Sequence, residues 1–302
     1  MSAESDRIIK RNSRMILANY LLQKQEVERN NKIKAKIVGG TGSYIEDSAL
    51  IPIHLGNLFL SQTEITDILA SVSIPITHIN GSITFNGSNS LSFVSATNLP
   101  IGNELYTIEC WVKINSTSEY GIVGWGNYGE INKVNAFRFG EDQLHNYWWN
   151  NDLAVNVYNI ADNNWHHVVC QYDGTDRRIY KDGIFIAGDV SEGEHNVTKT
   201  DNLSIGVTYY NEYFVGSISN LRIVRGVAVY SGTETEAVNF VVPIVPLTVT
   251  QSASTNISAI TNGQTSILLN TTGAAPFIDS AYGYVFSVNG VAPTISSDSP
   301  FS

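Results

Sequence analysis

The sequence predicts an all-β protein built from many short strands. Charged residues make up only 15% of the 302 residues, aromatic residues reach 10%, and Gly, Asn, Ser and Thr are plentiful. This balance is typical of short strands joined by tight turns. Asn-Gly and Asp-Gly pairs at residues 80–81, 86–87, 173–174 and 182–183 suit the positive φ of hairpin turns. A chain of this length can bury one large sandwich with appendages, or two modest domains.

Residues 1–38 are predicted to form a basic amphipathic helical arm. They hold nine of the 18 Lys and Arg residues and four of the 28 acidic residues, and residues 5–36 contain no Gly or Pro. The expected apolar face and its basic neighbours comprise Ile9, Ile16, Tyr20, Val27, Arg14 and Lys24. The heptad pattern is imperfect, so a free-standing coiled coil and a solvated leader remain alternatives to the favoured arm that folds on a neighbouring subunit.

Residues 39–80 are predicted to form a linker with one short helix. The glycine-rich run Gly39–Gly42 follows two apolar residues, as a phosphate-binding turn would, but the third glycine of a dinucleotide fingerprint is missing. A flexible linker is therefore favoured. Ser61 and Glu64 form a capping-box pattern, which predicts a helix over residues 61–71.

The strand-rich part is predicted to divide at residue 247. Residues 81–247 are expected to form the sandwich, and Pro243 and Pro246 mark its end. Residues 248–302 carry only Asp279 and Asp298 as charged residues, and alternation over residues 284–290 predicts further strands. This tail is predicted either to form a small β domain or cap, or to pair with another chain by strand addition.

The charge and hydropathy of the sequence argue against nucleic acid and membrane as partners of the sandwich. The sequence after residue 38 is acidic, which argues against nucleic-acid binding on the sandwich because phosphate backbones demand clustered Lys and Arg. We expect no membrane span and no signal peptide, and hence synthesis in a cytosol, because the long apolar runs that such segments need are missing. Cys110 and Cys170 lie in apolar runs and are expected to be free, buried thiols.

Five separated motifs resemble the laminin-G-like domains of the concanavalin A-like lectin/glucanase superfamily. They occupy residues 106–113 (YTIECWVK), 164–168 (NWHHV), 180–183 (YKDG), 203–206 (LSIG) and 214–223 (FVGSISNLRI). The resemblance covers roughly residues 81–247 and implies a jelly-roll β-sandwich. Such domains usually bind glycans or proteins, so the resemblance favours recognition over catalysis, although fold alone never fixes function.

The motif at residues 216–232 departs from the common ending of the family and resembles domains in structural proteins of large DNA viruses and phages. The leading hypothesis is a non-enzymatic virion structural protein, capsid-associated or fibre-like, made in the host cytosol. Its sandwich would serve recognition or host attachment, its arm would bind other capsid proteins, and copies would self-associate. A free carbohydrate-binding or adhesion protein is the alternative, and a divergent glycan-degrading enzyme is the weaker one.

No catalytic residue is predicted. Hydrolytic members of the superfamily place carboxylates at alternate positions of one strand, whereas the nearest pair here, Glu192 and Glu194, lies in a polar turn-like segment. His166 and His167 are adjacent on a predicted strand and so face opposite sides, which makes a shared metal ion unfavourable. The resemblance makes calcium a candidate cofactor at the sandwich rim, with Asp152, Asp173, Asp176 and Asp201 available, but the metal ligands stay unassigned.

Two aromatic segments are the candidate ligand-binding surface. Period-two alternation sends Trp148 to one face of the sheet and His145, Tyr147 and Trp149 to the other. Aromatic rings beside amides suit sugars, through apolar stacking and hydrogen bonds to hydroxyls. The candidate residues are His145, Tyr147, Trp149, Asn150, Asn151, Asp152, Tyr209, Tyr210 and Tyr213. The alternative for both segments is aromatic packing beneath the linker, the tail or a neighbouring subunit.

Overall fold

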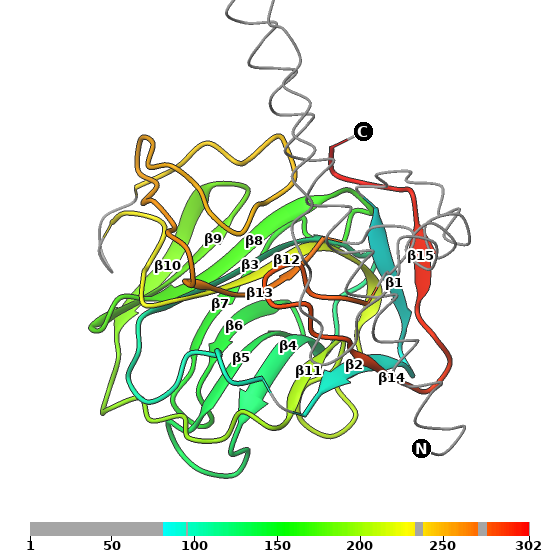
Figure 1. The fold of residues 1–302 in the computed structure, drawn as a ribbon, viewed down its shortest axis with the longest axis horizontal. Coiled ribbons are helices and arrows are strands. Elements are labelled where there is room, and N and C mark those ends of the chain that lie inside the picture. The colour runs from blue at the N-terminus through cyan, green and yellow to red at the C-terminus, as the bar shows by residue number, and fades with distance from the viewer. Residues whose placement is uncertain (1–80, 95, 233–237, 271–276, 302) are drawn as a thin grey trace, which may run out of the picture. The chain divides into compact units, whose positions relative to one another are not determined.

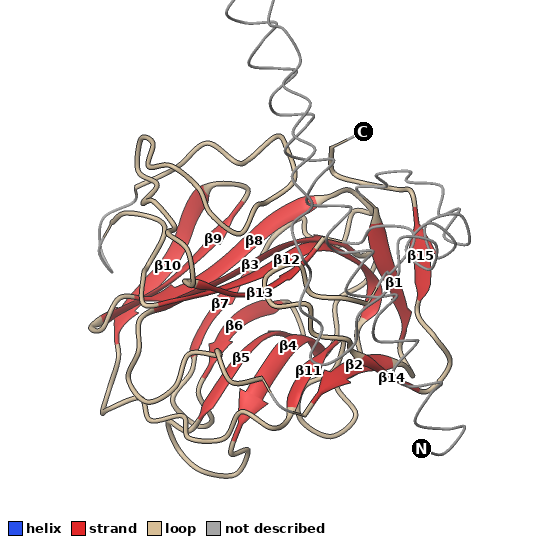
Figure 2. Ribbon diagram, in the orientation of Figure 1, coloured by secondary structure: helices blue, strands red, loops and turns tan. Residues whose placement is uncertain are grey.

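The computed structural model describes residues 81–302 except for residues 95, 233–237, 271–276 and 302. Within these ranges the chain consists of strands and loops, and no α-helix occurs (Figure 2). The described part of the chain accordingly holds no helix that could cross a membrane. The predicted arm of residues 1–38, the glycine-rich linker and the short helix at residues 61–71 lie outside the described residues.

Fifteen strands form two antiparallel sheets (Figure 1). The eight-stranded sheet runs in the order β10 (Ile184–Val190), β9 (Asp176–Lys181), β8 (His166–Tyr172), β3 (Tyr106–Lys113), β12 (Val215–Arg225), β1 (Ser82–Asn86) and β15 (Thr294–Ser296), with β13 (Thr265–Leu269) also pairing with β12. The seven-stranded sheet runs in the order β14 (Ser287–Asn289), β2 (Ser90–Phe93), β11 (Leu203–Ile205), β4 (Tyr120–Gly126), β5 (Val134–Gly140), β6 (Gln143–Tyr147) and β7 (Leu153–Asn156). The predicted all-β sandwich is confirmed for the described residues, and its two-sheet form is consistent with a jelly roll.

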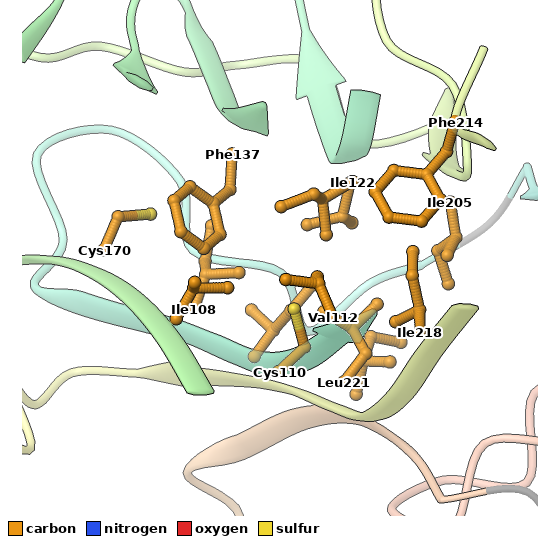
Figure 3. Packing of buried hydrophobic residues seen from close by; sticks show 14 of the residues in the cluster. Ile108, Cys110, Val112, Ile122, Phe137, Cys170, Ile205, Phe214, Ile218 and Leu221 are labelled. Atoms are coloured by element: carbon orange, nitrogen blue, oxygen red, sulfur yellow. The ribbon is translucent and has the colours of Figure 1, made fainter. Parts of the chain in front are cut away.

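The main hydrophobic core lies between the two sheets. Alternate residues of β3, namely Ile108, Cys110 and Val112, point toward Phe137 and Ile122 of the opposite sheet (Figure 3). This is the period-two pattern of a strand with one face in the core. Cys110 and Cys170 are both buried and free, as predicted, and burial raises the pKa of both thiols.

The hairpin between β9 and β10 shows why its turn needs Asp-Gly. Asp182 and Gly183 adopt φ values of 52° and 75°, the left-handed region that two-residue hairpin turns favour. A side chain on Gly183 would also place its Cβ 2.3 Å from the carbonyl oxygen of Phe240. Glycine is therefore required at this position both for the backbone conformation and for the close approach of a later segment.

The outer face of the eight-stranded sheet is covered by the chain that follows β12. Val169 and Tyr180 of the sheet form a second apolar cluster with Tyr230, Phe240 and Ile260. The rings of Tyr230 and Phe240 stack with centroids 3.7 Å apart. In Figure 1 this covering segment is the yellow and orange chain running over β8, β9 and β10. Strand β3 is consequently buried on both faces.

The tail after residue 247 is joined to both sheets of its own chain. Strand β13 pairs with β12, β14 pairs with β2, and β15 pairs with β1. The described segments before and after residue 247 are therefore joined by strand pairing. The physical reason is that β1 and β2 gain backbone partners along sides that would otherwise be open edges.

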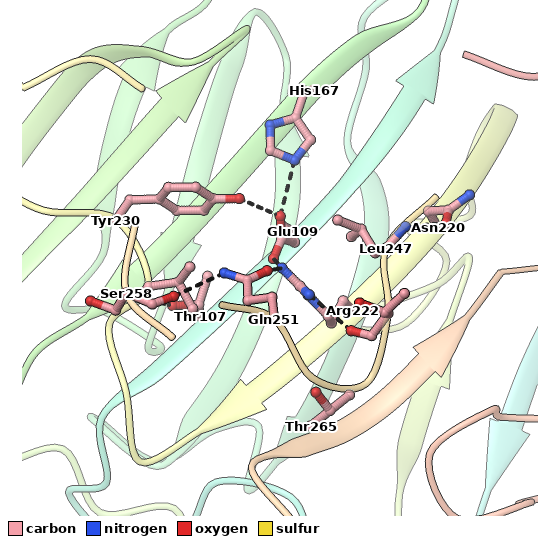
Figure 4. Close-up of polar contacts among 12 residues, drawn as sticks. Thr107, Glu109, His167, Asn220, Arg222, Tyr230, Leu247, Gln251, Ser258 and Thr265 are labelled. Atoms are coloured by element: carbon pink, nitrogen blue, oxygen red, sulfur yellow. Dashed lines mark hydrogen bonds and ion pairs between the residues drawn. The ribbon is translucent and has the colours of Figure 1, made fainter. Parts of the chain in front are cut away.

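A buried polar cluster connects the sheet to its covering segment (Figure 4). Glu109 of β3 accepts hydrogen bonds from Nε and Nη2 of Arg222 at 2.9 and 2.6 Å and from the Tyr230 hydroxyl at 2.6 Å. His167 Nε2 lies 3.1 Å from the same carboxylate. Arg222 also donates to the Gln251 side-chain oxygen at 2.8 Å. Each charge thus has several partners, as a buried ion pair requires.

Replacement of Arg222 by Met should strongly destabilise the protein. The change leaves the Glu109 carboxylate buried without its cation, and loss of one partner of a buried pair costs about 3–5 kcal/mol. Chemical denaturation measures this loss. Lys199→Met is the control, because the Lys199–Asp201 pair is exposed at 3.8 Å and should contribute less than about 1 kcal/mol. Equal losses for the two variants would contradict the assignment.

Acid should erase the contribution of Glu109 to stability. Burial alone would raise the pKa of this carboxyl, but Arg222, His167 and Tyr230 together lower it to about 2. A depressed pKa in the folded state means that the stabilisation is complete above the unfolded value near 4.5 and is lost as the pH falls toward 2. The difference in unfolding free energy between wild type and Glu109→Gln, measured from pH 7 to pH 2, should therefore shrink below pH 4.5. A difference that stays constant over this range would exclude this pKa.

Candidate functional site

The two predicted aromatic segments meet on the outer face of the seven-stranded sheet. Trp148 is buried in the core, where its ring stacks on His195 at 3.9 Å and its indole N–H donates to the Tyr106 hydroxyl at 2.8 Å. Tyr147 ends β6 and lies on the opposite side, as strand alternation predicts, and Trp149 follows in the turn beside it. The loop between β11 and β12 lies against β4, because the Gly121 amide donates to the Glu212 carbonyl at 2.8 Å. This loop carries Tyr209 and Tyr210 to Trp149.

Five rings form what we call the aromatic face: Tyr128, Tyr147, Trp149, Tyr209 and Tyr210. Trp149 meets Tyr209 edge-on with centroids 4.6 Å apart, and it also contacts Tyr128 and Tyr147 edge-on at 6.2 and 6.1 Å. Tyr128 stacks on Tyr209 at 5.5 Å. Tyr210 packs on Tyr209 at 3.9 Å and is 76% exposed. The face therefore combines a packed aromatic base with a ring that is open to solvent.

Small residues of the sheet make room for this base. A Cβ added at Gly124 would lie 2.3 Å from the Tyr128 hydroxyl oxygen and 2.9 Å from the Ala136 side chain. The Tyr128 hydroxyl is buried and has no hydrogen-bond partner among the described residues. Burial raises the pKa of Tyr128, and the Glu212 carboxylate adds to the effect. The hydroxyl therefore stays protonated and is able to donate a hydrogen bond.

The turn that presents Trp149 is held in an unusual backbone conformation. Trp149 and Asn150 have φ values of 68° and 58°, a region in which a bulky residue other than glycine is an outlier. The Asp152 carboxylate accepts a hydrogen bond from the Trp148 amide at 2.8 Å. The Asn151 carbonyl accepts one from Arg177 at 2.6 Å. Backbone strain of this kind concentrates at functional sites and persists only where the surroundings enforce it.

One ion pair lies beside the rings. Arg138 of β5 donates to Glu212 at 2.7 Å, lies 3.7 Å from Glu119, and places its guanidinium 5.1 Å from the centre of the Tyr147 ring. The Thr208 hydroxyl donates to the second oxygen of Glu212. His145 lies opposite Arg138 on β6, and burial together with the Arg138 charge lowers the pKa of His145 to about 4. His145 is therefore neutral at neutral pH.

The predicted site residues divide into three groups. Tyr147, Trp149, Tyr209 and Tyr210 come together in the aromatic face, and Asn150 is exposed directly beside Trp149. Asn151 and Asp152 turn inward and hold the turn through the bonds described above. His145 lies against Gly140, where an added Cβ would be 2.6 Å from the imidazole, and Tyr213 pairs through its backbone with Val207 at the base of the loop.

Three residues of the site were missed from the sequence: Tyr128, Arg138 and Glu212. Arg138 could have been found, because it occupies the position between the core residues Phe137 and Phe139 of β5 and must therefore face outward. Tyr128 and Glu212 lie in loops, where no periodicity indicates which way a side chain points. Only contacts between distant segments place them beside Trp149.

Two of the acidic residues that were available for calcium, Asp173 and Asp201, already have partners. Asp173 accepts from Arg178 at 2.8 Å and from the Asp176 amide at 2.7 Å, and Asp201 pairs with Lys199. Among the described residues no group of three or more His, Cys, Asp or Glu side chains could hold a metal ion. Oxygens engaged by Arg, Lys and backbone amides offer a hard cation few ligands.

The two adjacent histidines have separate partners. His166 bonds to Asp182 at 2.7 Å and to Asp162 at 3.0 Å, whereas His167 reaches the buried Glu109. The two histidines therefore share no ligand, and His167 is the one that is buried inside the sheet.

Comparison with known proteins agrees with the fold at the level of a superfamily. The model described as "concanavalin A-like lectin/glucanases superfamily" matches residues 85–229. No curated protein matches the chain. Among solved structures, mouse laminin α1 chain domains LG4-5 are 13% identical with a TM-score of 0.39, over 47% of this chain and 40% of that one. A Bacteroides ovatus protein described as carbohydrate-binding is 16% identical with a TM-score of 0.44, over 72% of this chain and 59% of that one.

The chain therefore spans 40% and 59% of the length of these two proteins, and likeness at this level does not bear on function. The superfamily match itself is confined to the sandwich that carries the aromatic face. The match covers residues 85–229, slightly less than half of the chain.

Proposed function

We propose that this protein is a non-enzymatic recognition protein whose aromatic face binds glycans. The observation that carries the proposal is the convergence of five aromatic rings from three separate segments around the strained turn at Trp149. Sugar rings stack their apolar faces on such side chains and use nearby polar groups to fix their hydroxyls. The exposed Asn150 amide supplies a polar group beside the rings.

The distribution of carboxylates supports binding rather than hydrolysis. A glycosidase needs a pair of Asp or Glu side chains flanking the scissile bond, yet no strand of the seven-stranded sheet contains Asp or Glu. The pair Glu192 and Glu194 is exposed in the loop after β10. The glutamates at the aromatic face, Glu212 and Glu119, instead form ion pairs with the Arg138 guanidinium.

We further propose that the recognition domain is displayed on a virion, as a capsid-associated or fibre-like protein. Two sequence features support this setting: the resemblance of residues 216–232 to viral structural domains, and the basic charge of residues 1–38. Residues 1 to about 50 would anchor the protein to other particle proteins or to further copies, since a basic segment attracts acidic protein surfaces. The free carbohydrate-binding protein remains the alternative, in which residues 1–38 would be dispensable.

Trp149→Ala should strongly weaken glycan binding without unfolding the protein. Loss of a central aromatic contact typically costs 2 kcal/mol or more, which is about a thirtyfold loss of affinity. Binding is measured on an immobilised glycan panel, and stability by thermal unfolding. Trp148→Ala is the matched control: this buried neighbour should cost about 3–5 kcal/mol of stability. If Trp149→Ala instead unfolds the protein as Trp148→Ala does, the ring belongs to the packing and the proposal fails.

Deletion of residues 1–38 should convert an oligomer into a monomer. The reason is that the proposed arm folds on a neighbouring subunit, so its removal takes away that contact. Light scattering coupled to size exclusion measures the mass of both forms. Full-length Trp149→Ala serves as the control and should keep the wild-type mass. If the full-length protein and the deletion variant are both monomers, the arm does not join copies of this chain.

A further inference from the structure

The seven-stranded sheet is almost free of charge. Its seven strands contain a single Asp, Glu, Lys or Arg side chain, which is Arg138 of β5. The strands of the eight-stranded sheet, in contrast, carry Glu109, Arg177, Arg178 and Arg222 among others. The aromatic face therefore lies on strands whose one charged residue is Arg138. Arg138 is therefore the one cation on these strands with which an acidic ligand could pair.

Arg138 is not available to such a ligand. Its side chain is only 7% exposed, and its partner Glu212 is 12% exposed. Glu212 occupies one side of the guanidinium at 2.7 Å, Tyr147 covers it at 5.1 Å, and the Nε hydrogen bonds to the Phe139 carbonyl at 3.2 Å. Thr208 fixes Glu212 through the second carboxylate oxygen. The only cation on the strands of this sheet is thus already paired with an acidic group of the protein itself.

We infer that the aromatic face selects uncharged glycans over carboxylate-bearing ones, and that Glu212 sets this selectivity by occupying Arg138. The inference rests on the glycan-binding function proposed above. An acidic sugar needs a cation with free hydrogen-bond donors, and charge-assisted bonds of this kind are the strong ones. Here it would meet two carboxylates, Glu212 and Glu119, around one arginine, and the repulsion would weaken binding. A neutral sugar needs only the rings and the uncharged donors.

Glu212→Gln tests the inference, because glutamine keeps the shape of the side chain and removes its charge. The probes are immobilised glycans in matched pairs, with and without a terminal sialic acid or uronic acid. Wild type should bind the neutral member at least tenfold more tightly. Because a hydrogen bond to a charged group contributes about 1.5–3 kcal/mol, Glu212→Gln should shift the ratio toward the acidic member by about tenfold or more. Asp201→Asn, the same charge change at a side chain that is 67% exposed, should leave the ratio unchanged.

Two further variants test whether the change in selectivity comes from the Arg138 guanidinium. Adding Arg138→Met to Glu212→Gln should remove the gain for acidic glycans, because the gain comes from the freed guanidinium. Glu119→Gln alters the weaker 3.7 Å partner, which is 66% exposed, and should shift the ratio in the same direction by about two- to threefold. This variant decides the question if Glu212→Gln does not fold.

Equal or tighter binding of the acidic member by wild type would overturn the inference, and so would an unchanged ratio in folded Glu212→Gln. The proposed glycan-binding function would survive either result, provided that Trp149→Ala still strongly weakens glycan binding. Failure of wild type to bind any member of either kind would overturn the proposed function and, with it, the selectivity.

Discussion

The buried contact between Glu109 and Arg222 is the constraint on which the rest of the structure depends. It places an ionised carboxylate inside the protein, and a charge can remain there only if every lone pair finds a donor. Arg222 of β12, Tyr230 of the covering segment and His167 of β8 supply those donors. Because Tyr230 and Gln251 follow the sandwich strands in sequence, the cluster requires the covering segment to lie on the sheet. The charge therefore specifies how the chain after β12 is placed.

This arrangement gives the two sheets different outer surfaces. On the eight-stranded sheet, Tyr230, Phe240 and Ile260 bury the outer face beneath the chain itself. On the seven-stranded sheet, the outward residues of β4 and β5 include Gly124, Ala136 and Arg138, over which aromatic side chains from loops can lie. Small residues on that sheet allow a close approach, and the left-handed turn at Trp149 completes it. One sheet thus supports the fold while the other is shaped for recognition.

The chemistry of the recognition surface follows from what surrounds its rings. Burial keeps the Tyr128 hydroxyl protonated, and His145 is neutral because burial and the nearby Arg138 disfavour a second positive charge. The Arg138 guanidinium is paired with Glu212, and Thr208 holds Glu212 in place through a hydrogen bond. Such a surface favours ring stacking and uncharged hydrogen bonds over ion pairs. These are the contacts that a protein makes with an uncharged sugar.

The sequence by itself determined the local features of this protein. Alternation along β6 sent His145 and Tyr147 to one face, the pair Asp182-Gly183 formed a hairpin turn, and apolar strands buried Cys110 and Cys170. These features depend on residues that are neighbours in the chain, so a period of two and the φ preference of one turn suffice to predict them.

Only the tertiary structure decided which distant segments meet. It brought Tyr128, Trp149 and Tyr209 together from three loops, paired Arg138 with Glu212, and joined the strands after residue 247 to both sheets. Strand pairing between distant segments depends on register and on the burial of whole faces, and neither leaves a signal at a single position. The candidate site consists of such contacts, so the sequence could supply four of its five rings and the Asn150 amide, but not the pairing of Arg138 with Glu212.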